Sequence, residues 1–466
     1  MREAAKPFVG LLPLYLKMYD ERMPDNRPVV QAFLDKVADC LVSAGAEVFR
    51  VPICRTEQEF RAAVKDIEEA GAESIVTLHL AYSPSLESSD VLVNSKLPII
   101  VLDTTPTYDF SGKQDDAEIM ANHGIHGVQD MCSMLRRYEK MFWVEAGHLD
   151  HSDVAQRVVK RARAVSAATA FHNAKIGIIG EPFKGMGDFY VTYGELRTTL
   201  GIEVVEFCSD SVKTITDGIT DKDVAEEIAR FKQLFNVDNE TKDQDFETTI
   251  RSCLTIRRWL EAEALSGFTF SFLDINSECG IKTMPFIEAG LAMTRGIGYA
   301  GEGDVLTAAM ITGLCHAYNG VTFTEMFCPG WSDDSIFLSH MGEANFDICV
   351  EKPKLTKIDF KFGDVPSPVV AYGKFRAGKA VFVNLPIGPN GYELVIAPVE
   401  MLKATGSKLL EHTVEGWFRP NMPISRFLEK YSHAGGTHHA GLVYDVDVWE
   451  MESFGRAMGF DVTVIE

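Results

Sequence analysis

Short apolar runs alternate with amphipathic stretches along the first third of the chain. The stretches Pro28–Ala44 and Glu57–Ala70 predict helices, because Pro28 suits an early helical position and Gly71 follows the second stretch. Near-continuous apolar strands separated by helices are typical of a parallel sheet covered on both faces. We therefore expect a doubly wound, flavodoxin-like α/β domain over residues 1–170. Its expected strands are Phe8–Leu14, Glu47–Val51, Ser74–Leu80 and Pro98–Leu102.

The same alternation begins again near Lys175. The run Ile176–Gly180 predicts a buried strand that ends in a glycine turn, and Ser152–Ala170 predicts a helix that joins the two regions, with Ser152 available as N-cap. We expect a second doubly wound α/β domain over residues 171–321. Its further strands are expected at Val204–Cys208 and Phe268–Leu273, and its helices at Asp221–Phe235 and Phe246–Ser266.

After about Thr322 the strand-like runs follow one another closely, with turn signals such as Pro389-Asn390-Gly391 between them. This pattern predicts a mainly antiparallel β domain over residues 322–466, a barrel or a sandwich. A last helix is expected at Val446–Met458, with Asp445 as N-cap and Gly459 beyond its end. The expected strands are Phe346–Val350, Lys357–Phe362, Val369–Phe375, Ala380–Leu385 and Glu393–Ala397.

Charge and cysteine content narrow the class of protein. The 466 residues carry a formal net charge of −22, and such a surface repels phosphate, so we expect neither nucleic-acid nor anionic-membrane partners. No apolar run reaches the roughly 18 residues of a membrane span, and Phe8–Leu16 is too short and too proline-interrupted for a signal peptide. Nine scattered cysteines without a CxxC pair favour a reduced, cytoplasmic protein.

Two glutamates in the second half of the chain stand out as candidate functional residues. Glu302 lies between two glycines, just ahead of the helical stretch Asp304–Ala317, where a helix start favours negative charge. Alternation places Glu325 on one face with Phe323 and Phe327, and a carboxylate on an apolar face is unusual unless it is paired or metal-bound. The simpler alternatives are that Asp304 caps the helix beside a solvated Glu302, and that Glu325 pairs with an Arg or Lys.

Histidines in two further segments complete the candidate set. His340 ends the strand-like run that begins at Ser335, and His438-His439 follows Gly435-Gly436. Adjacent histidines on an extended segment point to opposite sides, so we expect at most one of this pair to face a given site. A lone histidine in either place is more often a core or loop residue than a ligand.

Taken together, two carboxylates and neutral imidazoles suit Mn²⁺, Mg²⁺, Co²⁺ or Fe²⁺ better than a structural zinc ion, which prefers cysteine. Two glutamates close together also have proton affinities that are pushed apart, so that one can act as an acid and the other as a base. The pattern therefore favours a metal enzyme, provided that the fold brings these four segments together.

These segments resemble those of the L-arabinose isomerase family and, more distantly, of the L-fucose isomerases. The order of the segments and the spacings between their acidic and histidine residues are similar to the family pattern, and the resemblance extends into the N-terminal domain. The segments that carry it are Gly298–Asp304, Phe323–Glu325, Ser339–Met341 with Glu351–Pro353, Ala434–His439, Leu78–Pro84 and Asn122–Gly127.

The resemblance implies an aldose–ketose isomerase that works through a cis-enediol on an open-chain sugar. Glu302, Glu325, His340 and His439 would hold one divalent metal, usually Mn²⁺, and the two glutamates would also move protons between C1 and C2. His126, His123 and His438 would bind the sugar, with His126 reaching it from a neighbouring subunit. A homo-oligomer, a trimer or a hexamer, with the active site at a subunit interface is implied.

The chain departs from the family pattern at three places that line the expected pocket. Gly185–Asp188 does not match, Asp274–Cys279 is longer and more polar, and His123 stands where the family has glutamine. An unusual pentose, a deoxyhexose or another aldose is therefore open as the substrate. Two other functions remain as alternatives: a sugar-binding or sensing paralogue without turnover, and an epimerase or lyase that uses the same enediolate chemistry.

Overall fold

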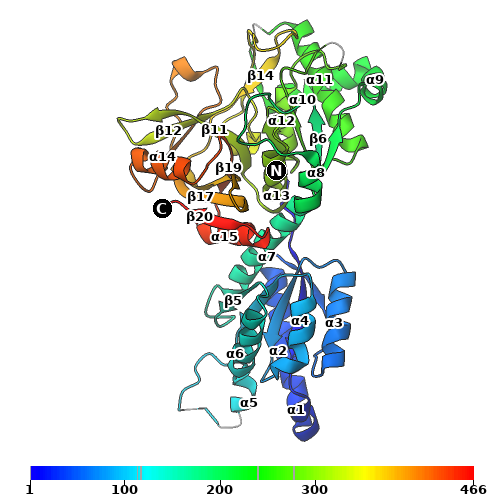
Figure 1. The fold of residues 1–466 in the computed structure, drawn as a ribbon, viewed down its shortest axis with the longest axis vertical. Coiled ribbons are helices and arrows are strands. Elements are labelled where there is room, and N and C mark those ends of the chain that lie inside the picture. Colours follow the sequence, from blue (N-terminus) through cyan, green and yellow to red (C-terminus); the bar gives the residue numbers. More distant parts are fainter. Residues whose placement is uncertain (1, 113, 116–117, 239–240, 277–278) are drawn as a thin grey trace. The chain divides into compact units, whose positions relative to one another are not determined.

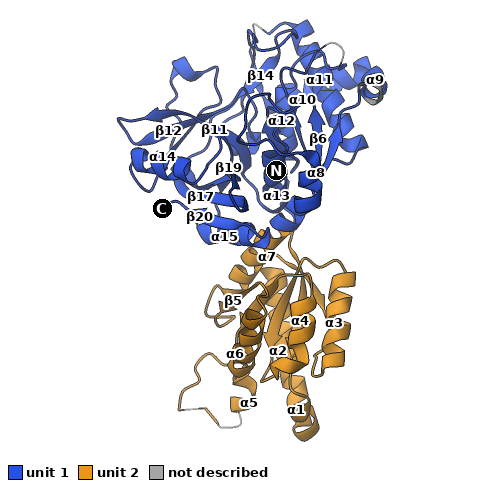
Figure 2. Ribbon diagram, viewed as in Figure 1, with its two compact units in different colours: residues 1–5, 167–466 blue, residues 6–166 orange. Residues whose placement is uncertain are grey.

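The computed structural model of the chain describes residues 2–112, 114–115, 118–238, 241–276 and 279–466. It contains two compact units (Figure 2). Unit 2 comprises Lys6–Ser166, and unit 1 comprises the chain up to Ala5 together with Ala167–Glu466. The expected division of unit 1 at residue 321 into central and C-terminal domains stays a prediction.

Unit 2 is built on a five-stranded parallel sheet in the order β2-β1-β3-β4-β5 (Figure 1). The expected parallel α/β fold is confirmed, and β1 has the bounds that the apolar run predicts. Apolar side chains of α3, α4 and α6 pack on one face of the sheet as a single buried core. The strands are β1 Phe8–Leu14, β2 Glu47–Arg50, β3 Ser74–His79, β4 Ile99–Asp103 and β5 Phe142–Ala146, and the helices are α1 Lys17–Arg22, η1 Pro24–Asn26, α2 Arg27–Ser43, α3 Glu57–Glu69, α4 Ser85–Asn94, α5 Ile119–Asn122 and α6 Gly124–Arg137.

Helix α7, Val154–His172, runs from unit 2 into unit 1, as the joining stretch predicts. Unit 1 begins with a four-stranded parallel sheet in the order β10-β9-β6-β7. Its strands are β6 Lys175–Ile179, β7 Glu203–Glu206, β9 Gly267–Phe270 and β10 Gly298–Gly301. Its helices are α8 Tyr193–Glu195, η3 Leu196–Leu200, α9 Ser209–Asp217, α10 Asp221–Leu234, α11 Asp243–Ala262, α12 Phe286–Thr294 and α13 Val305–Ala317.

The rest of unit 1 is a mostly antiparallel sheet in the order β15-β19-β11-β12-β18-β17-β16, which confirms the β-rich C-terminal region. An additional pairing of β15 with β17 closes it into a barrel, and β20 pairs with β17 in parallel. A smaller sheet has the order β14-β13-β8. The strands are β8 Asn236–Val237, β11 Val321–Gly330, β12 Ser335–Ser339, β13 Lys354–Lys357, β14 Val369–Tyr372, β15 Gly378–Asn384, β16 Ile387–Gly388, β17 Gly391–Met401, β18 Gly416–Pro420, β19 His439–Tyr444 and β20 Asp461–Val464; the helices are η4 Phe346–Ile348, η5 Lys408–Leu410, α14 Ile424–His433 and α15 Val448–Ala457.

Helix α13 connects the two parts of unit 1. Its residues are almost all buried, because it packs on β10, β9 and β6 of the parallel sheet and on β11 and β19 of the barrel. The turn that precedes α13 therefore lies beside the barrel strands, which is the arrangement the candidate site needs. None of the helices in the described ranges has the length and apolar character that a membrane crossing requires.

Three local predictions are wrong. The run Phe346–Val350 forms the short helix η4 and no strand, because the Asn345 side chain accepts a hydrogen bond from Asp347 N and starts a tight turn. Residues 358–362 form a loop after β13, held by hydrogen bonds from Ile358 N to Pro368 O and from Phe360 N to Ser367 Oγ. Helix α15 is capped by Asp447, which forms a capping box with Glu450, whereas Asp445 has a positive φ of 58° and pairs with Arg376.

Candidate functional site

Glu302 lies in a tight turn between β10 and α13. Its φ of 62° and that of 81° at Gly303 are both left-handed, a conformation that is uncommon for a residue with a side chain. A Cβ atom at Gly303 would lie 2.6 Å from Pro182 Cα, so only glycine lets the turn approach this close. Gly303 N donates to Thr269 Oγ1 at 3.0 Å, which fixes the turn and the direction of the Glu302 side chain.

The barrel strands bring the other candidate residues together through their register. Glu325 on β11 pairs with Ser339 on β12 and with His439 on β19. His340 follows Ser339 directly, so two imidazoles flank one carboxylate. The Nε2 atoms of His340 and His439 each lie 3.0 Å from Glu325 Oε1. The expectation that Glu325 is paired or metal-bound therefore has a structural basis, since its ion-pair partners among the described residues are His340 and His439.

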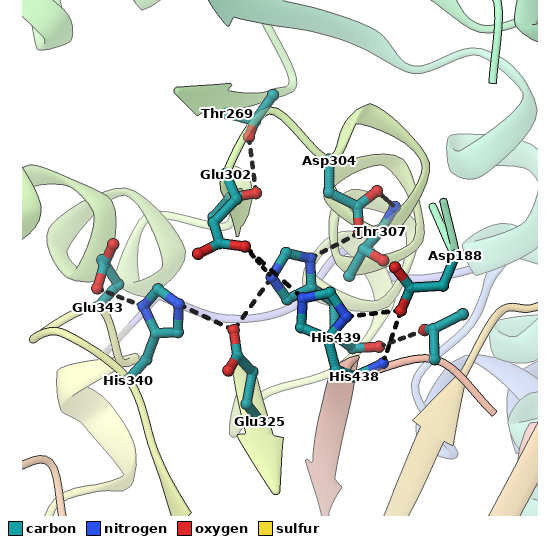
Figure 3. Close-up of polar contacts among 12 residues, drawn as sticks. Asp188, Thr269, Glu302, Asp304, Thr307, Glu325, His340, Glu343, His438 and His439 are labelled. Carbon is teal, nitrogen blue, oxygen red and sulfur yellow. Dashed lines mark hydrogen bonds and ion pairs between the residues drawn. The ribbon is translucent and has the colours of Figure 1, made fainter. Parts of the chain in front are cut away.

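Glu302 closes the site from the side of α13 (Figure 3). Its Oε2 atom lies 3.7 Å from His439 Nε2 and 3.6 Å from His438 Nε2. Glu302, His438 and His439 form one group of potential metal ligands whose donor atoms lie within 4.8 Å of one another, and Glu325, His340 and His439 form a second. The two groups share His439, so two carboxylates and three imidazoles converge on one region.

Each of the three imidazoles has a carboxylate within hydrogen-bond distance of its Nδ1 atom (Figure 3). His340 Nδ1 lies 2.6 Å from Glu343 Oε2, His439 Nδ1 lies 2.9 Å from Asp304 Oδ2, and His438 Nδ1 lies 2.6 Å from Asp188 Oδ2. A hydrogen bond from Nδ1–H to a carboxylate leaves Nε2 free to act as a ligand and makes it more basic, as in the histidines of metal sites. All three Nε2 atoms face the glutamates, which is the orientation that binding a common ion requires.

The charged groups of the site shift one another's proton affinities. Burial raises the pKa of the Glu325 carboxyl, but the neighbouring imidazoles of His340 and His439 outweigh this effect and hold the pKa well below its usual range. Burial lowers the pKa of His340, and the charge of Glu343 together with Glu325 outweighs it, so the pKa of His340 lies well above its usual value. Burial lowers the pKa of His438 too, yet the neighbouring carboxylates of Glu302 and Asp188 raise it to about 9. The carboxylates thus create a strongly negative environment that attracts cations.

The donor set fits a divalent metal ion. Glu302 Oε2, His438 Nε2 and His439 Nε2 are buried, and none makes a hydrogen bond within the described part of the chain. Buried polar atoms in native proteins are rarely left without a partner, so three such atoms facing one another favour a bound group between them. Carboxylate and imidazole donors without a cysteine suit Mn²⁺, Mg²⁺, Co²⁺ or Fe²⁺, as the sequence predicts.

The expectation that at most one residue of the histidine pair faces the site is wrong. The ring centroids of His438 and His439 lie 4.2 Å apart, and both Nε2 atoms point toward Glu302. Strand β19 begins at His439, so His438 belongs to the preceding turn and the alternation of an extended strand does not apply to it.

The other two candidate sugar-binding residues belong to unit 2, which is described by itself. His126 lies in the first turn of α6, and His123 precedes that helix. His123 Nε2 lies 2.9 Å from the Tyr19 hydroxyl, and its Nδ1 lies 2.9 Å from Ile119 O. The two imidazole rings contact edge to face, with centroids 5.7 Å apart. Their assignment to sugar binding stays a prediction.

Sequence reasoning missed the roles of three acidic residues at the site. The sequence pattern marks Asp188 only through the segment that departs from the family and Asp304 only as a helix cap, and it does not mark Glu343. Asp304 does cap α13, since its Oδ1 accepts from Thr307 N at 2.8 Å, while its Oδ2 holds His439. The segment Asp274–Cys279 also departs from the family pattern. In it, Asp274 accepts a hydrogen bond from Glu181 N at 3.0 Å, and residues 277 and 278 lie outside the described ranges.

Comparisons with known proteins find one family along most of the chain. Residues 185–318 match the family model of the L-arabinose isomerase central domain, and residues 320–461 match that of the L-arabinose isomerase C-terminal domain. L-arabinose isomerase of Shouchella clausii is 25% identical over 98% of this chain and 93% of its own length. L-arabinose isomerase of Bacillus subtilis is 23% identical over 91% of this chain and 87% of its own length. The chain belongs to the L-arabinose isomerase family and is an enzyme of the aldose–ketose isomerase type.

Proposed function

We propose that the protein interconverts an open-chain aldose and the corresponding ketose with one divalent metal ion, Mn²⁺ in the first instance, through a cis-enediol. The observation that carries this proposal is the convergence of Glu302 and Glu325 with three imidazole Nε2 atoms, each imidazole being held at Nδ1 by a carboxylate. Glu302, Glu325, His340 and His439 would hold the ion. When bound, the ion supplies positive charge that stabilises the negative charge developing on sugar oxygens O1 and O2.

The chain's own carboxylates move the protons. One glutamate of the pair removes the proton from C2 and a proton is returned at C1, while the hydroxyl proton of O2 passes to O1, so the hydrogen balance of the sugar is unchanged. Glu325 is ionised in the structure at hand, because the two imidazoles favour its charged form, and an ionised carboxylate has the lone pair that is needed to accept a proton. His438 lies beside Glu302 with an Nε2 atom that makes no hydrogen bond within the described residues, which suits it to binding a sugar hydroxyl.

The proposal includes a homo-oligomer, a trimer or a hexamer, in which His126 and His123 of one copy reach the sugar held by a neighbouring copy. The support for this part is the match of Asn122–Gly127 to the family segment that carries an active-site histidine. The relatives named L-arabinose isomerase make L-arabinose the first substrate to test.

The decisive experiment is to strip the protein of metal and to incubate it with aldopentoses, aldohexoses and deoxy sugars, with and without Mn²⁺, while measuring ketose formation. We expect ketose from at least one sugar only when Mn²⁺ is present, and restoration of activity when the ion is returned. Ketose formation at the full rate in the presence of a chelator would refute the metal dependence. Tight metal binding and sugar-induced thermal stabilisation without any product would favour a binding protein instead.

Asp304→Asn should weaken metal affinity by about 10–100-fold, the usual effect of removing a carboxylate that orients a metal-binding histidine. Asparagine is as good an N-cap as aspartate, so α13 should keep its cap while His439 Nδ1 loses its acceptor. Titration of the stripped variant with Mn²⁺ measures this loss. Asp447→Asn, the same change at the N-cap of α15 away from the site, is the matched control and should leave metal affinity unchanged. Equal affinities of the two variants would contradict the orienting role of Asp304.

A further inference from the structure

A cavity of about 200 Å³ adjoins the candidate metal site, and its lining consists of a few polar or charged side chains and a larger number of apolar ones. The polar side chains of the lining are Glu302, Glu325, His340 and Glu343, all of which belong to the metal site or hold its ligands. The remaining lining is apolar and consists of Met341 and an aromatic wall of six phenylalanines: Phe270, Phe272, Phe286, Phe327, Phe360 and Phe362.

Five of the six rings of the aromatic wall form a connected series of ring contacts. The ring centroids of Phe270 and Phe286 lie 5.8 Å apart, those of Phe286 and Phe360 5.8 Å, those of Phe360 and Phe362 5.7 Å, and those of Phe362 and Phe272 6.5 Å. These distances are typical of favourable aromatic pairs. The wall is therefore a packed surface whose rings hold one another in place.

The loop of residues 358–368 supplies two of these rings and is built to lie against the others. A Cβ atom at Gly363 would lie 3.0 Å from Phe272 O and 3.3 Å from the Phe360 ring, so glycine permits the close approach. Phe362 is 60% exposed and Phe327 is 45% exposed, although each lines the cavity. Large exposed apolar side chains that border a cavity are a common mark of a ligand-binding site.

A sugar whose O1 and O2 lie at Glu302 and Glu325 has the other end of its carbon chain available to contact the wall. A hydroxyl group that is removed from water against phenylalanine rings loses its hydrogen bonds, because the described polar side chains of the lining lie at the metal site. A methyl group at the same place gains from burial.

We propose that the aromatic wall selects an aldose whose carbon chain ends in a methyl group, a 6-deoxyaldose, over one that ends in a hydroxymethyl group. This inference rests on the proposed isomerase function and names the substrate class of the same site. An apolar pocket discriminates by about 10–200-fold for one methylene and by roughly 10²-fold against an added hydroxyl group. We therefore expect kcat/KM for the 6-deoxy sugar to exceed that of the matching hexose by about 10–100-fold.

Trios of sugars that share their configuration at C2 to C4 test the inference on the Mn²⁺-loaded full-length protein. L-arabinose, D-galactose and D-fucose form one such trio, D-xylose, D-glucose and 6-deoxy-D-glucose form another, and D-arabinose, L-galactose and L-fucose form a third. The expected result is that, in the configuration the enzyme accepts, the 6-deoxy sugar gives the highest kcat/KM. A hexose or a pentose that is used as well as its 6-deoxy partner would overturn the inference while leaving the isomerase function standing. No ketose from any trio would overturn both.

A pair of variants assigns the preference to the wall. Phe362→Ser should bring the ratio of kcat/KM between the 6-deoxy sugar and the hexose close to one, because it replaces an apolar ring of the wall with a hydroxyl group. Leu409→Ser changes a leucine that is 94% exposed on η5 and outside the cavity lining, and it should leave this ratio as in the parent protein. An unchanged ratio in Phe362→Ser would show that the wall does not set the preference.

Discussion

Glu302→Gln and Glu325→Gln should each lower kcat by about 10²–10⁴-fold, the usual contribution of general acid/base catalysis, while the protein stays folded. Glutamine keeps the shape of the side chain and one oxygen donor but cannot take up or deliver a proton at the reaction's pH. The effect follows from the position of both carboxylates beside the same imidazoles, with Glu325 Oε1 3.0 Å and Glu302 Oε2 3.7 Å from His439 Nε2. Steady-state kinetics with the preferred sugar at saturating Mn²⁺ measures the change in kcat.

Metal content separates loss of a ligand from loss of a proton carrier. If a variant regains full activity once Mn²⁺ is raised high enough to saturate it, its glutamate serves only as a ligand and the acid/base assignment is refuted. Glu415→Gln is the matched control, since Glu415 is a buried glutamate of the same unit that accepts hydrogen bonds from Thr405 and lies outside the site. This control should change kcat by a few-fold at most, even where it lowers thermal stability.

Hydrophobic patterning predicts the regular elements of this chain well. Strand β1 has the bounds of its apolar run, and the parallel α/β and antiparallel β regions occur where strand spacing and helical periodicity place them. The errors arise where a different local interaction decides the backbone. Alternation of Ile358, Phe360 and Phe362 resembles a strand, but these residues form a loop because the rings of Phe360 and Phe362 pack into the aromatic wall.

The candidate site divides in the same way into predictable and unpredictable parts. Glu325 could be picked out because a carboxylate on an apolar face is unusual, whereas the histidines stand out only as members of a set with the two glutamates. The carboxylates behind the imidazoles carry weaker signals. Glu343 is three residues from His340 and could have been found by its spacing, whereas Asp188 is 250 residues from His438 and only the fold brings the two together.

Unit 2 also contains a buried histidine, His79, to which the sequence pattern assigns no role. His79 ends β3 and is 3% exposed, and neither ring nitrogen makes a hydrogen bond within the described residues. The start of α6 packs against it so closely that a Cβ atom at Gly127 would lie 2.3 Å from its Cδ2 atom. Burial lowers the pKa of His79 from 6.5 to about 3, against a smaller opposing effect of Asp130. His79 is therefore neutral in the folded protein at any pH above about 3.

This burial should make the stability of unit 2 depend on pH. Between about pH 6.5 and 3 the unfolded chain takes up a proton at His79 and the folded chain does not, so the folded state loses stability as the pH falls. This loss is absent above about pH 6.5 and grows to at most about 4–5 kcal/mol at pH 3, since one pKa unit corresponds to about 1.4 kcal/mol. The tight packing around the ring leaves little room for a charged, hydrated form.

His79→Leu should flatten this pH dependence, because leucine has no proton to gain and fills much of the same space. The stability of unit 2 in both proteins is measured by urea unfolding between pH 4 and 7. Hydrogen exchange in peptides from β1 and β3 monitors the unfolding. The free energy of unfolding of unit 2 in the parent protein should fall, relative to that in the variant, by roughly 1.4 kcal/mol for each pH unit below about 6. His433→Leu removes an exposed histidine of α14, which belongs to unit 1, and should leave the pH dependence of the stability of unit 2 unchanged. Parallel pH profiles of the parent protein and His79→Leu would show that His79 is protonated equally in the folded and unfolded chains.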